Sequence, residues 1–219
     1  MPDVGARKPR RTASSRRRTP SQERSVELVG KLLEATAQVL GEVGLEATST
    51  NKIAARAGVA IGSIYQYFPN KEALIDALLD DRLHRLEALT ASRMEALSTN
   101  SYPEAAEAML RAAIAFYEAE PELAAMLASR TAMPEPNSRD RMLYQRVHDI
   151  ARSYLVAHAD NLDVDDIELA ATISTRVVGN FAPWIALSVT NADKRERFIA
   201  EIVLMLSQWI GAPRHETHR

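Results

Sequence analysis

The 219-residue sequence contains no cysteine, and it has no apolar run long enough to form a membrane helix. Without cysteine, disulfide scaffolds, thiol nucleophiles and thiolate metal sites are excluded, and a reducing cytosol is the simplest setting. The longest uncharged apolar run, residues 177–192, is shorter than the roughly 20 residues that a membrane helix needs. The N-terminal residues also lack the apolar core of a secretory signal. We therefore expect a cytoplasmic protein with no membrane partner.

The sequence also lacks the motifs that many enzyme classes require. It has no glycine-rich phosphate loop and no nucleophile elbow. Its five histidines do not fall at the i, i+4 spacing of a helical metal site within an ordered segment. The acidic stretch after Asp160 fails the calcium-loop pattern, because Glu168 stands where that loop needs glycine. We therefore predict no enzymatic activity, no cofactor and no metal site.

The overall formal charge of −2 is the average of two unlike parts. Residues 1–24 carry eight Lys or Arg and two acidic residues, a net charge of +6, so the remainder of the chain carries −8. Residues 1–24 are also rich in Pro, Ser and Thr and have almost no large apolar residue. Such a segment cannot bury enough surface to offset the entropy of ordering. The sequence therefore predicts a disordered basic arm over residues 1–24.

Apolar residues recur at helical spacing almost everywhere after Ser25, and no stretch shows sustained strand alternation. The sequence therefore predicts an all-α protein of about nine helices with no internal repeat. Thr50, Asn70 and Asp163 are the expected N-caps of three helices, and Gly58 is expected to supply a tight turn. The expected divisions after the arm are an N-terminal domain at 25–79, a C-terminal domain at 80–211 and a tail at 212–219.

Residues 48–67 have the pattern of a helix-turn-helix, the motif whose second helix enters the DNA major groove. A short helix follows Thr48, Gly58 makes the turn, and a second short helix is expected from Ile61 to Phe68. The sequence IAARAGV at 53–59, followed by GSIYQYFPNKEAL at 62–74, resembles the N-terminal DNA-binding domain of the TetR family of bacterial transcriptional regulators. The resemblance extends over residues 26–79 and implies a homodimer that binds a palindromic DNA operator.

The chemistry of the motif predicts which residues touch DNA. Gly62 allows close approach of the backbone, Gln66 can pair with the edge of adenine, and Ile61 can meet a thymine methyl group. The resemblance implies that four residues contact phosphates: Thr50, Ser63, Tyr67 and Lys71. It places five others near the bases: Asn51, Ala60, Ile61, Tyr65 and Gln66. Ala60 departs from the family, in which many members have serine with a capping hydroxyl. As an alternative, Tyr65 and Phe68 belong to the core of the domain.

Two sets of residues in the C-terminal domain are candidates for binding. Aromatic, methionine and polar side chains on the middle helices are typical of a small-molecule pocket, although they are equally typical of an ordinary core. The pocket candidates are Met109, Phe116, Tyr117, Met126, Tyr144, Arg176, Asn180 and Trp184. The last two helices are apolar over much of their circumference, which indicates an interface. The dimer candidates are Val177, Val178, Phe181, Phe198, Ile202, Val203, Leu206 and Trp209.

The sequence thus predicts a DNA-binding transcriptional regulator, nucleoid-associated in the cell. The expected form is a homodimeric repressor that a small-molecule effector of unknown identity releases from its operator. Two alternatives remain open: an activator, and an architectural DNA-binding protein that has no effector.

The arm carries a prediction of its own. Deleting residues 1 to 20 should weaken DNA binding and flatten its salt dependence while leaving sequence preference largely intact, because phosphate contacts carry no sequence information. Gel shifts with the intergenic DNA upstream of the gene, over a series of salt concentrations, measure both quantities. An unchanged salt slope would instead assign the arm to solubility.

Overall fold

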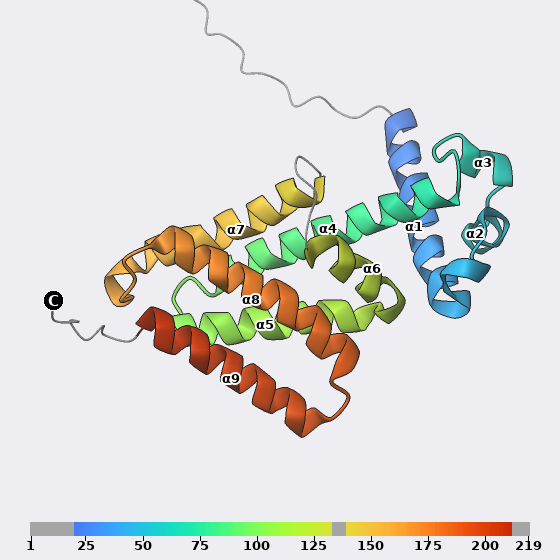
Figure 1. Ribbon diagram of the computed structural model, residues 1–219. Coiled ribbons are helices and arrows are strands. Elements are labelled where there is room, and N and C mark those ends of the chain that lie inside the picture. The colour runs from blue at the N-terminus through green and yellow to red at the C-terminus, as the bar shows by residue number, and fades with distance from the viewer. Residues whose placement is uncertain (1–19, 133–138, 212–219) are drawn as a thin grey trace, which may run out of the picture.

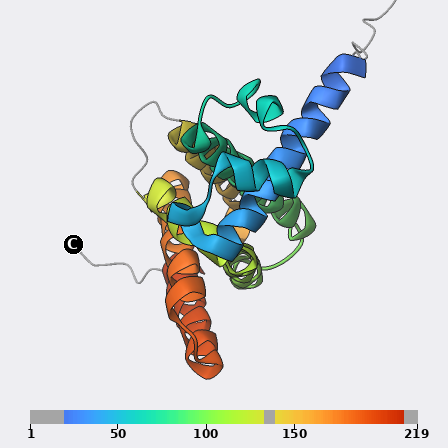
Figure 2. The same ribbon diagram turned by 90° about the vertical axis from the view of Figure 1, so that its right-hand side faces the viewer.

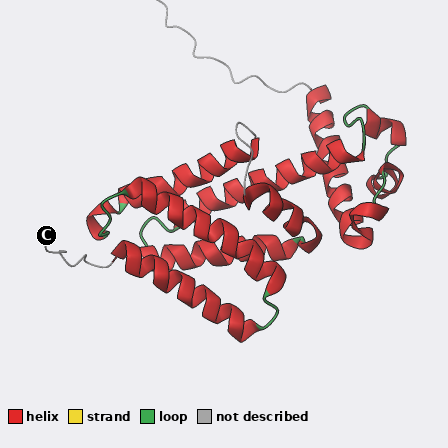
Figure 3. Cartoon of the chain, viewed as in Figure 1, coloured by secondary structure: helices red, strands yellow, loops and turns green. Residues whose placement is uncertain are grey.

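The computed structural model describes residues 20–132 and 139–211, and in these ranges it contains nine α-helices, one 3-10 helix and no strand (Figure 3). The predicted all-α fold is confirmed. The predictions for residues 1–19 and for the tail at 212–219 lie outside the described residues. The helices are α1 Pro20–Ala47, α2 Thr50–Ala57, α3 Ile61–Tyr65, α4 Lys71–Ala96, α5 Tyr102–Ala119, α6 Pro121–Ala132, α7 Arg139–Ala157, α8 Ile167–Ser188 and α9 Ala192–Gly211.

The helices form a small N-terminal unit and a larger C-terminal bundle that share α4 (Figure 1). Helices α1 to α3 lie together at one end, and α4 runs from them into the bundle. There α4 packs against α5, α6 and α7, while α8 lies against α5, α6 and α7. In the view turned by 90°, α8 and α9 project away from the N-terminal unit (Figure 2).

Local sequence explains most helix ends. Asn70 caps α4 by accepting a hydrogen bond from the Ala73 amide at 2.8 Å, as predicted. At the start of α5, Glu104 accepts a hydrogen bond from the Ser101 amide at 2.9 Å, which is the carboxylate half of a capping box. Gly44 has a positive φ of 74°, so α1 bends there and resumes to Ala47 instead of ending.

Three predicted boundaries were wrong by a few residues. Helix α1 begins at Pro20, so the final five residues of the predicted disordered arm are helical. Ser49, not Thr50, caps α2, because the Ser49 hydroxyl accepts from the Lys52 amide. Asp166, not Asp163, caps α8 and accepts from the Leu169 amide at 2.9 Å. For α2 and α8, a nearby residue has the same capping chemistry as the predicted one, and only the backbone conformation selects between the two.

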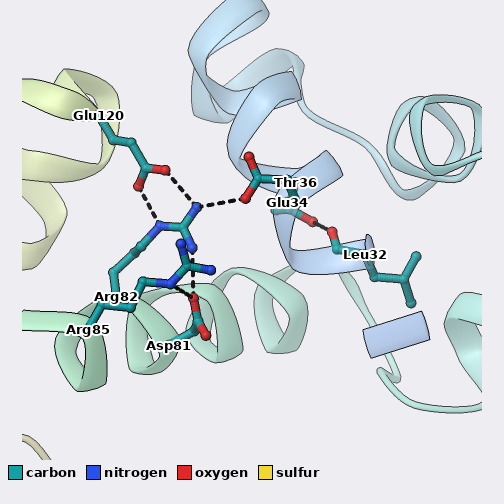
Figure 4. Close-up of polar contacts among 7 residues, drawn as sticks. All are labelled: Leu32, Glu34, Thr36, Asp81, Arg82, Arg85 and Glu120. Atoms are coloured by element: carbon teal, nitrogen blue, oxygen red, sulfur yellow. Dashed lines mark hydrogen bonds and ion pairs between the residues drawn. The ribbon is translucent and has the colours of Figure 1, made fainter. Parts of the chain in front are cut away.

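A buried arginine on α4 joins the two parts of the molecule (Figure 4). The Arg82 side chain is almost inaccessible, with 2% of the residue exposed. Its guanidinium donates to both carboxylate oxygens of Glu120, one at 2.6 Å, to Asp81 at 2.7 Å and to Glu34 on α1 at 3.4 Å. Burial alone would lower the pKa of Arg82, but the hydrogen bonds and charges of Glu120 and then Asp81 raise it above its ordinary value. Arg82 therefore stays charged and ties α1 to the junction of α5 and α6.

We predict that Arg82→Met destabilises the chain by about 3 kcal/mol, since the hydrogen bonds of Arg82 to Glu120 and Asp81 are lost and these partly buried carboxylates are left without their cation. For a chain of this size, that loss lowers the melting temperature by roughly 6 to 12 °C. Thermal unfolding followed by circular dichroism measures the shift.

Arg111→Met is the matched control. Arg111 also binds two carboxylates, Glu107 and Glu196, but its side chain is 44% exposed. Exposed ion pairs contribute less than about 1 kcal/mol. Equal effects of the two substitutions would contradict a special role for the buried cluster.

Candidate nucleic-acid interface and internal cavity

The turn between α2 and α3 is set by one glycine and a few buried residues. Gly58 lies in the left-handed region with φ of 68°, as predicted, and its amide donates to the carbonyl of Ala55. Ile53 and Ile64 are fully buried and Phe68 is nearly so. These side chains belong to the core and α3 packs against α2, so the opposite face of α3 is presented to solvent.

The outward face of α3 carries most of the residues predicted to read DNA. Tyr65 is 53% exposed, so the alternative that places it in the core is wrong, whereas Phe68 belongs to the core. Ser63 is partly buried near the start of the helix. The remaining predicted base-reading residues are exposed on α2, at the start of α3 or along it: Asn51, Ala60, Ile61, Gly62 and Gln66.

Hydroxyl groups link the candidate phosphate-binding residues to their neighbours. The Thr50 and Tyr65 hydroxyls lie 3.2 Å apart and share a hydrogen bond. The Ser25 hydroxyl donates to the Tyr67 hydroxyl at 2.8 Å, which connects the end of the motif to α1. These contacts fix the side chains before any partner arrives. Sequence reasoning missed Ser25, because it lies well outside the motif and has no periodic signal.

The positive charge on this face comes from lysines. Lys71 donates to the Leu45 carbonyl at 3.3 Å, and Lys52 on α2 is exposed and donates to the Ala47 carbonyl at 2.8 Å. The sequence analysis did not single out Lys52, although its position two residues after Thr50 puts it in the same short helix. Arg56 is already paired with Glu42. Ala60 makes no side-chain cap, as its departure from the family pattern predicts.

The C-terminal bundle encloses a cavity of about 150 Å³ between α4, α5, α7 and α8. Its wall is apolar over most of its surface, with a few polar groups on each of the four helices. Of the eight predicted pocket residues, five line it: Met109, Tyr117, Tyr144, Arg176 and Asn180. The other three do not, and they are Phe116, Met126 and Trp184.

The polar groups of the cavity are ordered by specific contacts. The Arg176 guanidinium lies over the Tyr144 ring, 4.2 Å from its centroid. Tyr102 and Ser174 share a hydrogen bond of 2.9 Å between their hydroxyl oxygens. Burial raises the pKa of Tyr102 to about 12 and also raises the pKa of Tyr144, against the opposing charge of Arg176. Both phenols are therefore neutral near pH 7.

The outer side of α8 and α9 exposes apolar side chains. Trp184 is exposed and packs edge to face against Phe181 and against Phe198 on α9, with ring centroids 6.1 and 5.0 Å apart. Of the predicted dimer residues, Ile202 and Leu206 are buried within the chain. Phe181 is exposed, and five are partly buried: Val177, Val178, Phe198, Val203 and Trp209. Sequence reasoning missed three exposed residues of the same helices: Leu187, Leu204 and Met205.

None of the helices in the described part of the chain is both long and apolar enough to span a bilayer.

Comparison with known proteins identifies related regulators. One curated relative is the helix-turn-helix-type transcriptional repressor KstR2 from Rhodococcus jostii, which is 34% identical over 127 residues, or 53% of this chain and 61% of the relative. The chain spans between about four- and six-tenths of the length of the first curated relatives that it matches.

Solved structures share the fold over nearly their whole length. A TetR-family regulator from Mesorhizobium loti has a TM-score of 0.67 at 18% identity and covers 86% of this chain and 99% of its own. The regulator FadR from Bacillus subtilis was solved in complex with stearoyl-CoA. It has a TM-score of 0.60 at 18% identity, and the match covers 85% of this chain and 99% of the FadR chain.

Two family models match the chain in sequence. The model described as bacterial regulatory proteins of the tetR family matches residues 32–78, which contain α2, α3 and the start of α4. The model described as the tetracyclin repressor-like C-terminal domain matches residues 101–209, which contain most of the cavity wall. The chain therefore belongs to the TetR family of bacterial transcriptional regulators.

Proposed function

We propose that the protein is a homodimeric repressor that binds a palindromic DNA operator and is released from it by a small molecule in the internal cavity. The main observation in support of this proposal is that α4 contacts both the helix-turn-helix and the cavity. Its first turns support the helix-turn-helix through Leu74 and Leu78, and its later turns line the cavity through Leu83, Leu86 and Met94. One rigid helix therefore belongs to both sites.

The residues on and beside the exposed face of α3 suit two roles on DNA, base reading and phosphate binding. Exposed Gln66 reads base edges in the major groove, with Asn51, Ala60, Ile61 and Tyr65 beside it. Tyr67, Lys71, Thr50 and Ser63 hold phosphates. A side chain at Gly62 would meet open space within the chain, so the fold itself does not require glycine there. Close approach of a DNA backbone supplies the missing reason.

The exposed apolar side of α8 and α9 supports a dimer. Large apolar side chains gathered on two adjacent helices are typical of an interface. A twofold interface would double the helix-turn-helix and allow two α3 helices to enter successive major grooves about one helical turn apart. The buried residues Ile202 and Leu206 stay in the core of each subunit, and the exposed Phe181, Leu204 and Met205 form the contact.

In this proposal, a ligand releases the protein from DNA by shifting the population between a DNA-binding conformation and one that does not bind the operator. A small molecule that binds better when α4 is displaced would favour dimers whose α3 helices no longer match the half-sites. The cavity on the same helix favours this function over an architectural DNA-binding protein that has no effector. The repressor assignment is supported by the name of the relative KstR2, and the binding of a ligand is supported by the structural neighbour FadR, which was solved in complex with stearoyl-CoA.

We predict that Tyr67→Phe combined with Lys71→Ala weakens operator binding about tenfold at low salt and reduces the salt slope by about one, because one phosphate contact with a cation is lost. By contrast, Gln66→Ala should reduce the preference for the operator over unrelated DNA and leave the salt slope unchanged. Gel shifts or fluorescence anisotropy with the upstream intergenic DNA measure both effects.

Arg93→Ala is the control, since Arg93 is exposed near the far end of α4 and its substitution removes the same charge. No salt-sensitive binding by the unaltered protein would refute the proposed function. The same salt slope for the double variant and Arg93→Ala would refute the phosphate roles.

We also predict that Leu204→Glu combined with Met205→Glu converts the dimer to monomers and abolishes operator binding at micromolar concentration. The two residues are 49% and 50% exposed, so the change places charge in the interface without disturbing the core of the chain. Light scattering gives the mass. Val156→Glu, at an equally exposed position on α7, should remain dimeric. A monomeric unaltered protein would exclude the proposed dimer.

A further inference from the structure

The internal cavity limits the size of its occupant. Its volume of about 150 Å³ equals that of an engineered protein cavity that binds benzene. One six-membered ring, or a chain of about six to eight carbons, therefore fits without rearrangement of the wall. A long acyl chain exceeds this volume.

The charges on the wall favour one kind of polar group. The lining residues of the described cavity include the cation Arg176 and no aspartate or glutamate. Tyr144 holds this guanidinium by stacking, with 4.2 Å between the guanidinium carbon and the ring centroid. In a wall that is otherwise mostly apolar, a positive charge attracts an anion strongly because little water screens it. The cavity therefore favours an anionic ligand over a neutral or cationic one.

Two hydroxyl groups in the wall point to the same conclusion. Thr175 on α8 is 8% exposed, and its Oγ1 atom is buried with no hydrogen-bond partner. The proton of the buried Tyr144 hydroxyl also has no acceptor, since the polar neighbour of this hydroxyl is the cation Arg176. A buried hydroxyl without a partner is costly, so it needs an explanation. An acceptor oxygen on a bound molecule would satisfy such donors.

The rest of the wall is mostly apolar and would contact the body of the ligand, since the hydroxyls of Thr90, Tyr102 and Tyr154 already have hydrogen-bond partners within the chain. Helix α4 contributes Leu83 and Leu86, α5 contributes Met109, and α7 contributes Val147 and Leu155. These side chains offer no hydrogen bond to a second polar group on this side. The ligand is therefore expected to be polar at one end and apolar at the other.

We propose that the cavity binds a small monocarboxylic acid whose body is one ring or a chain of about six to eight carbons. Arg176 attracts the carboxylate, and the hydroxyls of Thr175 and Tyr144 donate hydrogen bonds to it. The inference rests on the proposed function where it treats the cavity as the effector site. The size and charge of the ligand follow from the wall alone.

Calorimetric titration of the full chain, without DNA, tests this proposal. The probes are benzoate, phenylacetate, hexanoate and octanoate, each compared with its primary amide, which has nearly the same shape and no charge. We expect each acid to bind about tenfold more tightly than its amide, because hydrogen bonds to charged groups are stronger than those between neutral groups. Palmitate should bind more weakly than octanoate.

Variants locate the carboxylate. Arg176→Gln should remove the preference for acid over amide, and Thr175→Val, which keeps the shape of the side chain, should weaken acid binding roughly fivefold. Arg93→Gln removes a charge outside the cavity and should retain the preference. Circular dichroism confirms that each variant is folded. If Arg176→Gln does not fold, the comparison of acid with amide on the unaltered chain still decides the question.

Three results would overturn the inference: no binding of any acid at millimolar concentration, equal affinity for acids and amides, or tighter binding of palmitate than of octanoate. A parallel gel shift separates this failure from that of the proposed function. Operator binding without acid binding would reject the ligand class and keep the regulator. Acid binding without operator binding would reject the regulator and keep the ligand class.

Discussion

The buried guanidinium of Arg82 constrains how the two parts of the chain meet. A charge removed from water must be compensated by nearby charges of opposite sign. Here the carboxylates of Glu34 on α1 and of Glu120 between α5 and α6 compensate it. Any shift of α1 against the bundle would lengthen contacts to a side chain that has little access to water. The cluster therefore favours a small number of discrete arrangements over continuous sliding, because each must again satisfy the same charge.

This constraint makes α4 a natural link between the two proposed sites. Arg82 lies in the middle of the helix, between the residues that support α3 and those that line the cavity. Thr90 and Met94 in the cavity wall follow Arg82 by about 12 and 18 Å along the helix axis, at about 1.5 Å per residue. A helix with satisfied backbone hydrogen bonds moves as a unit over such a length. Occupation of the cavity would thus act on the Arg82 cluster and on the orientation of the helix-turn-helix together.

Local chemistry made part of the fold predictable from sequence. Asn70 and Gly58 were identified because a cap or a tight turn depends on one side chain and a few neighbours. The placement of Trp184 outside the cavity was not predictable, because an α8 that is apolar on several faces does not reveal which face meets its own bundle. The sequence position of Arg82 does indicate that its side chain is buried. It stands at helical spacing between Leu79 and Leu86, on the buried stripe, where an arginine must have partners.

The electrostatics of the N-terminal unit bear on how binding energy would be divided on DNA. The exposed face of α3 has no charged residue, and Arg56 of α2 is paired with Glu42. Lys52 and Lys71 supply positive charge beside α3, against a net charge of −8 outside residues 1–24. In the proposed function, attraction to phosphates would come from these lysines and from the +6 segment at 1–24, while Gln66 and its neutral neighbours would discriminate between bases. In the proposed function, separate segments thus carry the salt-dependent and the sequence-dependent parts of DNA binding.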